Sequence, residues 1–252
     1  MIDLTIFKHH STVVDENEFF VQYLSESYPW RYDSNFFILK FQPYLQEFKL
    51  IEEMQLVSHR QNQMNHLRFF WPLNTGLTNE VTNYFNREAY MLDLLELYSI
   101  EPTSFKPSKG NDHVTVEIVN DQTLNAFKSF NYPSDKEYGL EFANKKRTFY
   151  DDLVENEHSR LYIATINHTV VGSLLTFESK HFIEIDDVLV HEDYRHQKIA
   201  TSLQLKVMEE ATEKDKTVIL IADGEDSVKD MYQRQGYKLH GYHIGALKTL
   251  NH

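Results

Sequence analysis

Residues 190–203 read VHEDYRHQKIATSL and join an apolar stretch to an amphipathic one through a polar, basic turn. The stretch before the turn, 181–190, reads as a strand, and the apolar residues after it recur at helical spacing. A strand that passes abruptly into a helix directs the unpaired N–H groups and the dipole of the first helical turn at an anion. Arg195 and Lys198 add positive charge there. The stretch predicts a pyrophosphate-binding turn, and the alternative is a solvated surface loop.

Composition narrows the class of protein. The chain has 252 residues, of which 41% are hydrophobic and 13% aromatic, so a packed core is expected. Its formal net charge of −13 disfavours a nucleic-acid partner. The absence of cysteine excludes disulfides, thiolate zinc sites and a cysteine nucleophile. No apolar run is long enough for a membrane span and the N-terminus is not a signal peptide, so we expect a cytoplasmic protein without a membrane partner.

Two histidines near the turn do not predict a metal site. His191 and His196 are five residues apart, which places them on different faces of a helix. No metal is therefore expected.

A linker at 101–112, EPTSFKPSKGND, divides the chain into domains at 1–110 and 113–252. The second part predicts an α/β fold with a mixed sheet and helices on its faces. Its expected strands are 113–119, 160–167, 169–179, 181–190 and 217–223, with one or two more at 238–248. Its expected helices are 122–130, 140–157, 199–215 and 227–237.

The first part reads as a degenerate copy of the second. It predicts strands at 36–41, 66–71 and 92–100, with helices at 44–61 and 80–90 between them. The segment FNREAY at 85–90 aligns with YQRQGY at 232–237, which places Phe85 where Tyr232 stands. This order of elements indicates an internal repeat.

Residues 113–252 resemble the GNAT superfamily of acyl-CoA-dependent N-acetyltransferases. The family's pyrophosphate loop follows Arg/Gln-x-x-Gly-x-Gly/Ala, and here it reads RHQKIA at 195–200, with Lys198 in place of the middle glycine. The family's Leu-Tyr-x-x-x-Gly-Phe motif corresponds to MYQRQGY at 231–237. The resemblance implies a GNAT fold, with the N-terminal half a non-catalytic GNAT-like module.

The resemblance also implies how acetyl-CoA, the expected co-substrate, is held. The backbone of one strand end pairs with the pantetheine arm, and the turn and helix start hold the pyrophosphate. The cofactor-binding residues implied in this way are Val188, Leu189, Val190, Arg195, His196, Gln197, Lys198, Ile199, Ala200 and Thr201. The glycine replaced by Lys198 normally lets the backbone approach phosphate closely.

Direct transfer of an acetyl group to an amine needs a base and an acid. Glu184, Asp186 and Asp187 are the candidate bases, and alternation along a strand predicts Glu184 and Asp186 on one face with Asp187 on the other. The resemblance implies that Tyr232 protonates the CoA thiolate. The alternatives are solvent-facing or ion-paired carboxylates and a core tyrosine.

The sequence thus predicts an acetyl-CoA-dependent N-acetyltransferase that acts on a primary amine of a small molecule or peptide. The negative net charge slightly favours a cationic acceptor. The rival hypothesis is a protein that binds or senses acyl-CoA without transfer. The oligomeric state stays open, with a homodimer among the alternatives.

Overall fold

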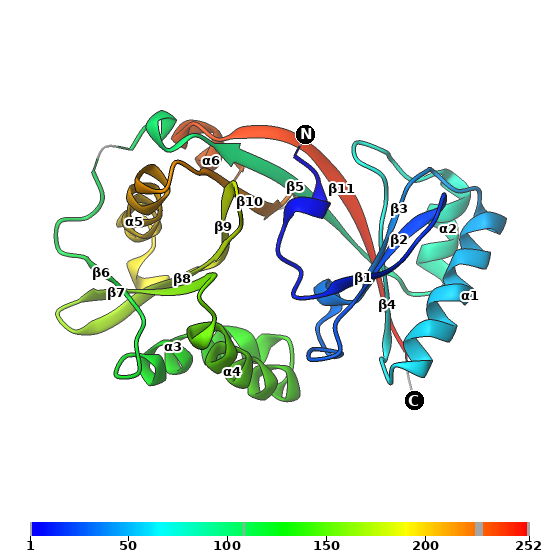
Figure 1. Cartoon of the computed structure of the whole chain (residues 1–252), viewed down its shortest axis with the longest axis horizontal. Helices are drawn as coiled ribbons and strands as arrows, with labels where there is room; N and C mark the ends of the chain where they lie inside the picture. Colours follow the sequence, from blue (N-terminus) through cyan, green and yellow to red (C-terminus); the bar gives the residue numbers. More distant parts are fainter. Residues whose placement is uncertain (1, 108, 225–228, 251–252) are drawn as a thin grey trace. The chain divides into compact units, whose positions relative to one another are not determined.

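The computed structural model describes residues 2–107, 109–224 and 229–250. The chain packs into two compact units (Figure 1). Unit 1 comprises Met1–Leu97, Ala222–Lys229 and Leu239–His252, and unit 2 comprises Tyr98–Ile221 and Asp230–Lys238. The linear division predicted at 110–113 follows the repeat along the chain, whereas packing places the last strand with the N-terminal residues.

Unit 1 is built on the strand order β1-β2-β3-β4-β11. Neighbouring strands pair antiparallel except β3 and β4, which are parallel. A helix, α1, connects the two parallel strands, as such a crossover requires. The bounds are β1 Thr12–Glu16, β2 Phe20–Leu24, β3 Phe36–Leu39, α1 Leu45–Gln61, β4 His66–Phe70, α2 Asn79–Arg87, β5 Met91–Ile100 and β11 Lys238–Thr249.

Aromatic side chains fill the core of unit 1. Phe48 of α1, Phe69 of β4 and Phe85 of α2 are fully buried and pack around Trp71. Ala246 of β11 is part of the same cluster. The C-terminal strand therefore contributes both hydrogen-bonded backbone and core volume to this unit.

Unit 2 is built on the strand order β10-β9-β8-β7-β6. Strands β6 to β9 pair antiparallel, and β9 pairs parallel with β10 across the helix α5. The bounds are β6 Thr115–Ile118, α3 Leu124–Glu137, α4 Leu140–Glu155, β7 Ser159–Ile166, β8 Thr169–Glu178, β9 Phe182–Val190, α5 Ile199–Glu213, β10 Thr217–Asp223 and α6 Lys229–Gln235.

Helices cover both faces of this second sheet (Figure 1). Two adjacent residues of β8 identify which helix lies on which side, because successive side chains point to opposite faces. A Cβ on Gly172 would meet Ile199 and Leu203 of α5, and the hydroxyl of Ser173 donates to Oδ1 of Asn131 in α3 at 2.9 Å. Helix α5 therefore covers one face, and α3 with α4 covers the other.

Most of the predicted elements form, with two differences. The turn at Asn167 and His168 is the expected tight hairpin, since both residues have positive φ. The stretch from 238 onward is one strand, which is within the one or two expected there. The first difference is that the first expected helix of unit 2 runs on through Pro133 to Glu137. Strands β1 and β2 precede the first strand expected from sequence.

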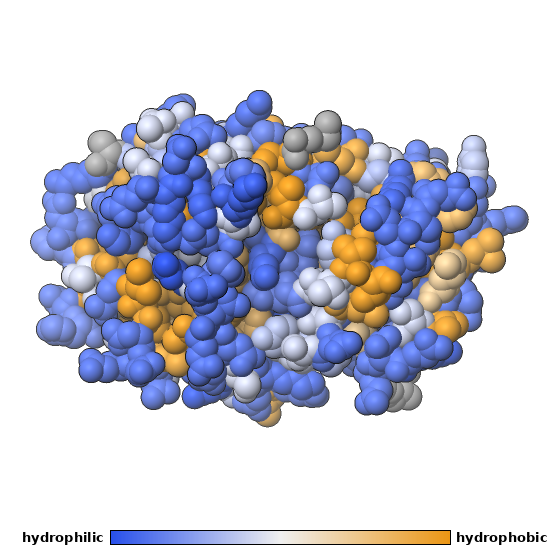
Figure 2. Space-filling model, in the orientation of Figure 1, coloured by the Kyte–Doolittle hydropathy of each residue, from blue (hydrophilic) through white to orange (hydrophobic). Residues whose placement is uncertain are grey.

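The face in Figure 2 is mostly hydrophilic, with separate hydrophobic patches. Exposed apolar side chains include Val14 of β1 and Leu50 of α1, at 51% and 70% exposure. Among the residues described, no helix has the length and apolar character to cross a membrane.

Candidate functional site

Strands β9 and β10 lie parallel but pair over only part of their length. The paired residues run from Phe182 with Thr217 to Ile185 with Leu220, whereas β9 continues to Val190 and stays paired with β8 to that point. One edge of β9 thus has no ladder partner in β10 beyond Ile185. This edge includes the predicted Val188, Leu189 and Val190, all half-buried. An exposed strand edge of this kind can bind the amide groups of an extended ligand.

A β-bulge interrupts β9 beside this edge. The register with β8 shifts between the pair Ser173–Leu189 and the pair Leu175–Asp186, so the bulged strand has one residue more than its partner. Asp187 lies in the bulge and has φ +48°, in the left-handed region. Its backbone N–H donates to Oδ1 of Asp186 at 2.9 Å.

The bulge brings the three candidate bases to one face. Cross-strand partners share a face, which places Glu184 and Asp186 on the same side as Ser173, facing α3 and α4. Asp187 also points there, because its carboxylate contacts Lys146 of α4 at 2.7 Å. The prediction that Asp187 faces the other way is wrong, since the positive φ of the bulge breaks the alternation.

Lys146 bridges two carboxylates in this region. Its Nζ lies 3.0 Å from Oδ1 of Asp135 and 2.7 Å from Oδ2 of Asp187. Burial raises the pKa of Asp135 although Lys146 lies beside it. Burial would lower the pKa of Lys146, but the surrounding Asp187, Tyr150 and Asp135 raise it above its usual value. The group therefore carries a buried ammonium between two acids.

The first turn of α5 presents unused backbone donors. Its first hydrogen bond runs from the Ser202 amide to the Lys198 carbonyl at 2.9 Å. Within the described parts of the chain, no backbone N–H of residues 196–201 donates a hydrogen bond to another residue. The N-cap Lys198 is left-handed, with φ 59°, and its side chain does not cap the helix. These amides are therefore available to an external acceptor such as phosphate.

Residues from the linker hold this turn in place. The side-chain amide of Asn111 donates to the Gln197 carbonyl at 2.9 Å, so the N–H of the same peptide group points the opposite way. The Asn111 backbone N–H donates to Oγ of Ser202, also at 2.9 Å. A Cβ on Gly110 would lie 2.3 Å from that hydroxyl oxygen, so this approach requires glycine.

The side chains of the turn are solvent-exposed and cationic. Arg195, His196, Gln197 and Lys198 are exposed, Ala200 and Thr201 are half-buried, and Ile199 is buried in the core. Across the residues that the structure covers, Arg195 and Lys198 form no ion pair. Both charges therefore remain available to an anionic ligand. The turn thus combines amides that donate no hydrogen bond in the described chain with two exposed cations that form no ion pair.

Comparison with known proteins finds two family models that match separate parts of the chain. Residues 121–237 match the acetyltransferase (GNAT) family, and residues 2–98 match a domain of unknown function. The match to the GNAT family model thus lies in the C-terminal part of the chain. The comparison with curated proteins found no match.

Solved structures extend the GNAT fold to the whole chain. A conserved protein of unknown function from Staphylococcus epidermidis has a TM-score of 0.90 at 28% identity, covering 99% of this chain and 98% of its own. A GCN5-related N-acetyltransferase from Kribbella flavida has a TM-score of 0.64 at 13% identity, covering 96% and 91%. A tandem GNAT protein from the clavulanic acid biosynthesis pathway has a TM-score of 0.56 at 9% identity, covering 92% and 79%. The last two show likeness of fold alone.

Tyr232, the candidate acid, is largely buried. It lies in α6 and is 8% exposed. Its ring centroid is 5.5 Å from that of Tyr98 and 5.3 Å from that of Tyr237. The residues just before α6, 225–228, lie outside the described part of the chain.

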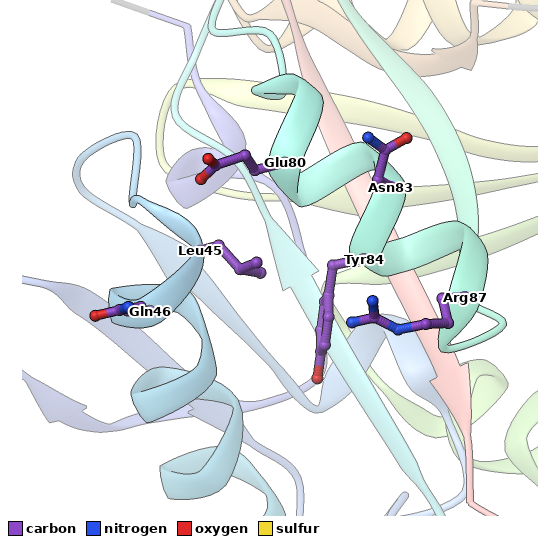
Figure 3. A pocket seen from close by; sticks show the side chains of 6 residues that line it. All are labelled: Leu45, Gln46, Glu80, Asn83, Tyr84 and Arg87. Atoms are coloured by element: carbon purple, nitrogen blue, oxygen red, sulfur yellow. The ribbon is translucent and has the colours of Figure 1, made fainter.

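The helix of unit 1 that corresponds to α5 starts differently. The carboxylate of Glu47, in the first turn of α1, accepts the backbone N–H of Tyr44 at 2.7 Å. A carboxylate of the chain itself therefore uses an amide at this helix start. The hollow beside this helix start is lined by Leu45, Gln46, Glu80, Asn83, Tyr84 and Arg87 (Figure 3). Arg87 pairs with Glu88 and lies over the Tyr84 ring. The residues directly before α1 are Gln42, Pro43 and Tyr44, and none of the three is a cation.

The helix ends of the two units nevertheless share a backbone pattern. The Tyr90 amide donates to the Phe85 carbonyl, and the Tyr237 amide donates to the Tyr232 carbonyl, both at 3.0 Å. Ala89 has φ 56° and its counterpart glycine has φ 103°. Both are the left-handed helix end of the Schellman type. The repeat seen in sequence therefore extends to local geometry.

The sequence missed three residues of this site: Asp135, Lys146 and Asn111. Each reads as an ordinary polar residue of a helix or linker, and only packing brings them to the bulge and the turn. For the part of the chain that is described, no cluster of three or more His, Cys, Asp or Glu side chains could hold a metal.

Proposed function

We propose that this protein is an acetyl-CoA-dependent N-acetyltransferase that transfers an acetyl group directly to a primary amine of a small molecule or peptide. The observation that carries the proposal is the start of α5. Within the described chain, six consecutive amides there donate no hydrogen bond and two cations form no ion pair, and the edge of β9 that β10 leaves unpaired precedes this turn. This combination suits a diphosphate joined to an extended amide-containing arm.

The residues fit acetyl-CoA in two places. The amides of 196–201, with Arg195 and Lys198, would hold the diphosphate. The backbone of Val188–Val190 would bind the amides of the pantetheine arm. An arm lying along that edge would bring the thioester, which supplies the acetyl group, to the bulge at Asp187.

The chain's own acids and bases then move the protons. An amine attacks only in its neutral form, and the carboxylates of Glu184, Asp186 and Asp187 are the candidates to take its proton. The amine nitrogen forms a bond to the acetyl carbon as the carbon–sulfur bond breaks. The hydroxyl of Tyr232 is the candidate to protonate the departing thiolate, since a phenol is protonated at neutral pH.

The acceptor is proposed to be cationic before it reacts. Three carboxylates lie on the face of β9 that α3 and α4 cover. Lys146 of α4 forms an ion pair with one of them, Asp187. The formal charge of the whole chain, −13, also attracts cationic molecules, over longer distances. Polyamines, aminoglycoside-like compounds and peptide amines are the acceptor classes to test.

The direct experiment measures release of CoA thiol from acetyl-CoA with a panel of such amines, with mass spectrometry to identify the acetylated product. Thiol release that depends on an amine, with one acetyl group added to it, supports the proposal. Release that is independent of every amine would be hydrolysis and would count against it.

The second candidate is an acyl-CoA-binding or sensing protein without transfer. The observation in its favour is Lys198, which stands in a left-handed position where the family pattern has glycine and keeps a side chain beside the phosphate site. Calorimetric titration with acetyl-CoA beside the thiol-release assay separates the two. Tight binding with no release for any amine would favour the sensor.

A further inference from the structure

Lys146 connects a buried carboxylate to the carboxylate of the β9 bulge. It contacts Asp135 at 3.0 Å on one side and Asp187 at 2.7 Å on the other. Side-chain exposure increases along this row, from 5% for Asp135 through 12% for Lys146 to 39% for Asp187. The row thus runs from the interior of the α3–α4 pair to the accessible surface beside the candidate acetyl position.

The ammonium of Lys146 is held from several directions. The rings of Phe142 and Tyr150 lie on the same helix, each with its centroid 5.7 Å from Nζ. The Tyr150 hydroxyl donates to Oδ2 of Asp135 at 3.1 Å, which fixes the carboxylate behind the lysine. A confined lysine fixes the geometry of its partner, because the rotamer entropy has already been lost on folding.

The row is graded in accessibility. Asp135 is buried and the side chain of Lys146 is mostly buried, whereas the side chain of Asp187 is 39% exposed. A carboxylate at the accessible end attracts a cationic ligand. Asp187 is the member that a ligand can reach.

We propose that Lys146 and Asp135 are positioning residues that hold the Asp187 carboxylate toward the acceptor, so that Asp187 binds the ammonium form of the amine and takes its proton. This inference rests on the proposed N-acetyltransferase activity and assigns the base within it. The proton leaves the amine nitrogen for a carboxylate oxygen of Asp187, and Lys146 keeps its own proton throughout. Lys146 favours the ionised carboxylate, while Asp135 offsets part of the lysine's charge and keeps Asp187 basic.

The test is the pH dependence of kcat/KM, measured with acetyl-CoA and the amine that the wild-type protein acetylates. Lys146→Met should move the acidic limb of the profile to higher pH by about one unit, because the neighbouring cation is lost. Asp135→Asn should move the same limb to lower pH, because Lys146 then acts on Asp187 alone. Lys146→Arg keeps the charge and should restore the wild-type limb.

Lys128 provides a matched control. It forms an ion pair between the same two helices, with Asp151 of α4, but its partner lies away from β9. Lys128→Met should lower thermal stability without moving the acidic limb. If Lys146 is only a brace between helices, its methionine variant will behave in the same way.

Opposite shifts for Lys146→Met and Asp135→Asn support the inference. An unchanged limb in both, with normal wild-type turnover, overturns it and leaves the proposed activity standing. If Lys146→Met does not fold, the direction of the Asp135→Asn shift decides. Absence of amine-dependent turnover in the wild-type protein overturns both proposals together.

Discussion

The side chain of Asn111 donates a hydrogen bond to the carbonyl of Gln197 at 2.9 Å, and this bond joins the linker to the turn that precedes α5. The carbonyl and the N–H of one trans peptide group point in opposite directions, so the Lys198 amide points away from Asn111. A residue 86 positions away in sequence thereby orients a donor of the candidate diphosphate site.

Asn111→Ala should therefore weaken acetyl-CoA binding indirectly, because Asn111 orients the turn that would bind the ligand. Loss of one neutral hydrogen bond corresponds to about 1 kcal/mol, or roughly a five-fold rise in Kd by calorimetry. Asn156→Ala is the control, since Asn156 accepts the His158 amide in a different loop. Equal effects of the two substitutions would show that the linker does not organise the turn.

Arg195→Ala should weaken acetyl-CoA binding by roughly 1.5–3 kcal/mol, the scale of a charge-assisted hydrogen bond to phosphate. The effect should diminish as salt is added, because the side chain is exposed. Lys206→Ala removes a cation from the same helix away from its start and should leave Kd unchanged. A Kd for Arg195→Ala within two-fold of wild type, measured at low salt, would remove Arg195 from the site.

Tyr232→Phe should lower kcat by 10²- to 10⁴-fold with little change in acetyl-CoA affinity, as expected for loss of a general acid. Tyr237→Phe is the matched control on the neighbouring ring. The Tyr237 hydroxyl donates to Gln204 at 2.9 Å, so its loss should cost about 1 kcal/mol of stability and spare turnover. Normal turnover of Tyr232→Phe would exclude the tyrosine as the acid.

Unit 1 should lose stability in mild acid. Burial lowers the pKa of His59 to about 4 and that of His66 to about 3. The unfolded chain takes up these protons below pH ~6.5 while the folded unit does not, so stability is intact above that pH and falls as pH decreases toward 4.

His59 alone should cost about 2 kcal/mol between pH 7 and pH 5. Urea unfolding at the two pH values measures this, and His59→Gln should reduce the difference by about that amount. Substitution of the exposed His158 by glutamine should not reduce it.

A fragment ending at residue 110 should not fold by itself. Strand β4 pairs with Gly245–Thr249 of β11, and Ala246 is buried in the unit 1 core. The fragment would lack this strand and expose the β4 edge, which favours aggregation. Mixing it with a 113–252 fragment should restore a cooperative unfolding transition. A stable, monomeric 1–110 fragment would contradict this expectation.

Local sequence patterns were sufficient to predict most helices and strands of unit 2. The alternation in β7 and β8, the Asn167–His168 turn and the helical spacing after Ile199 all describe interactions between near neighbours, which sequence carries directly. The turn at 195–200 was recognisable for the same reason. Strand β1 was not predicted, because it is exposed along its whole length and lacks an alternating apolar pattern. Strand β2 is buried on both faces, so its burial does not alternate along the strand either.

The sequence by itself determined the GNAT resemblance, the internal repeat and the position of the basic turn, because each depends on the order and spacing of residues along a continuous segment. Only the tertiary structure decided that Asp187 faces α4, that Lys146 and Asp135 lie behind it, and that β11 completes unit 1. A bulge reverses side-chain direction without changing residue type, and pairing between distant segments leaves no local periodicity.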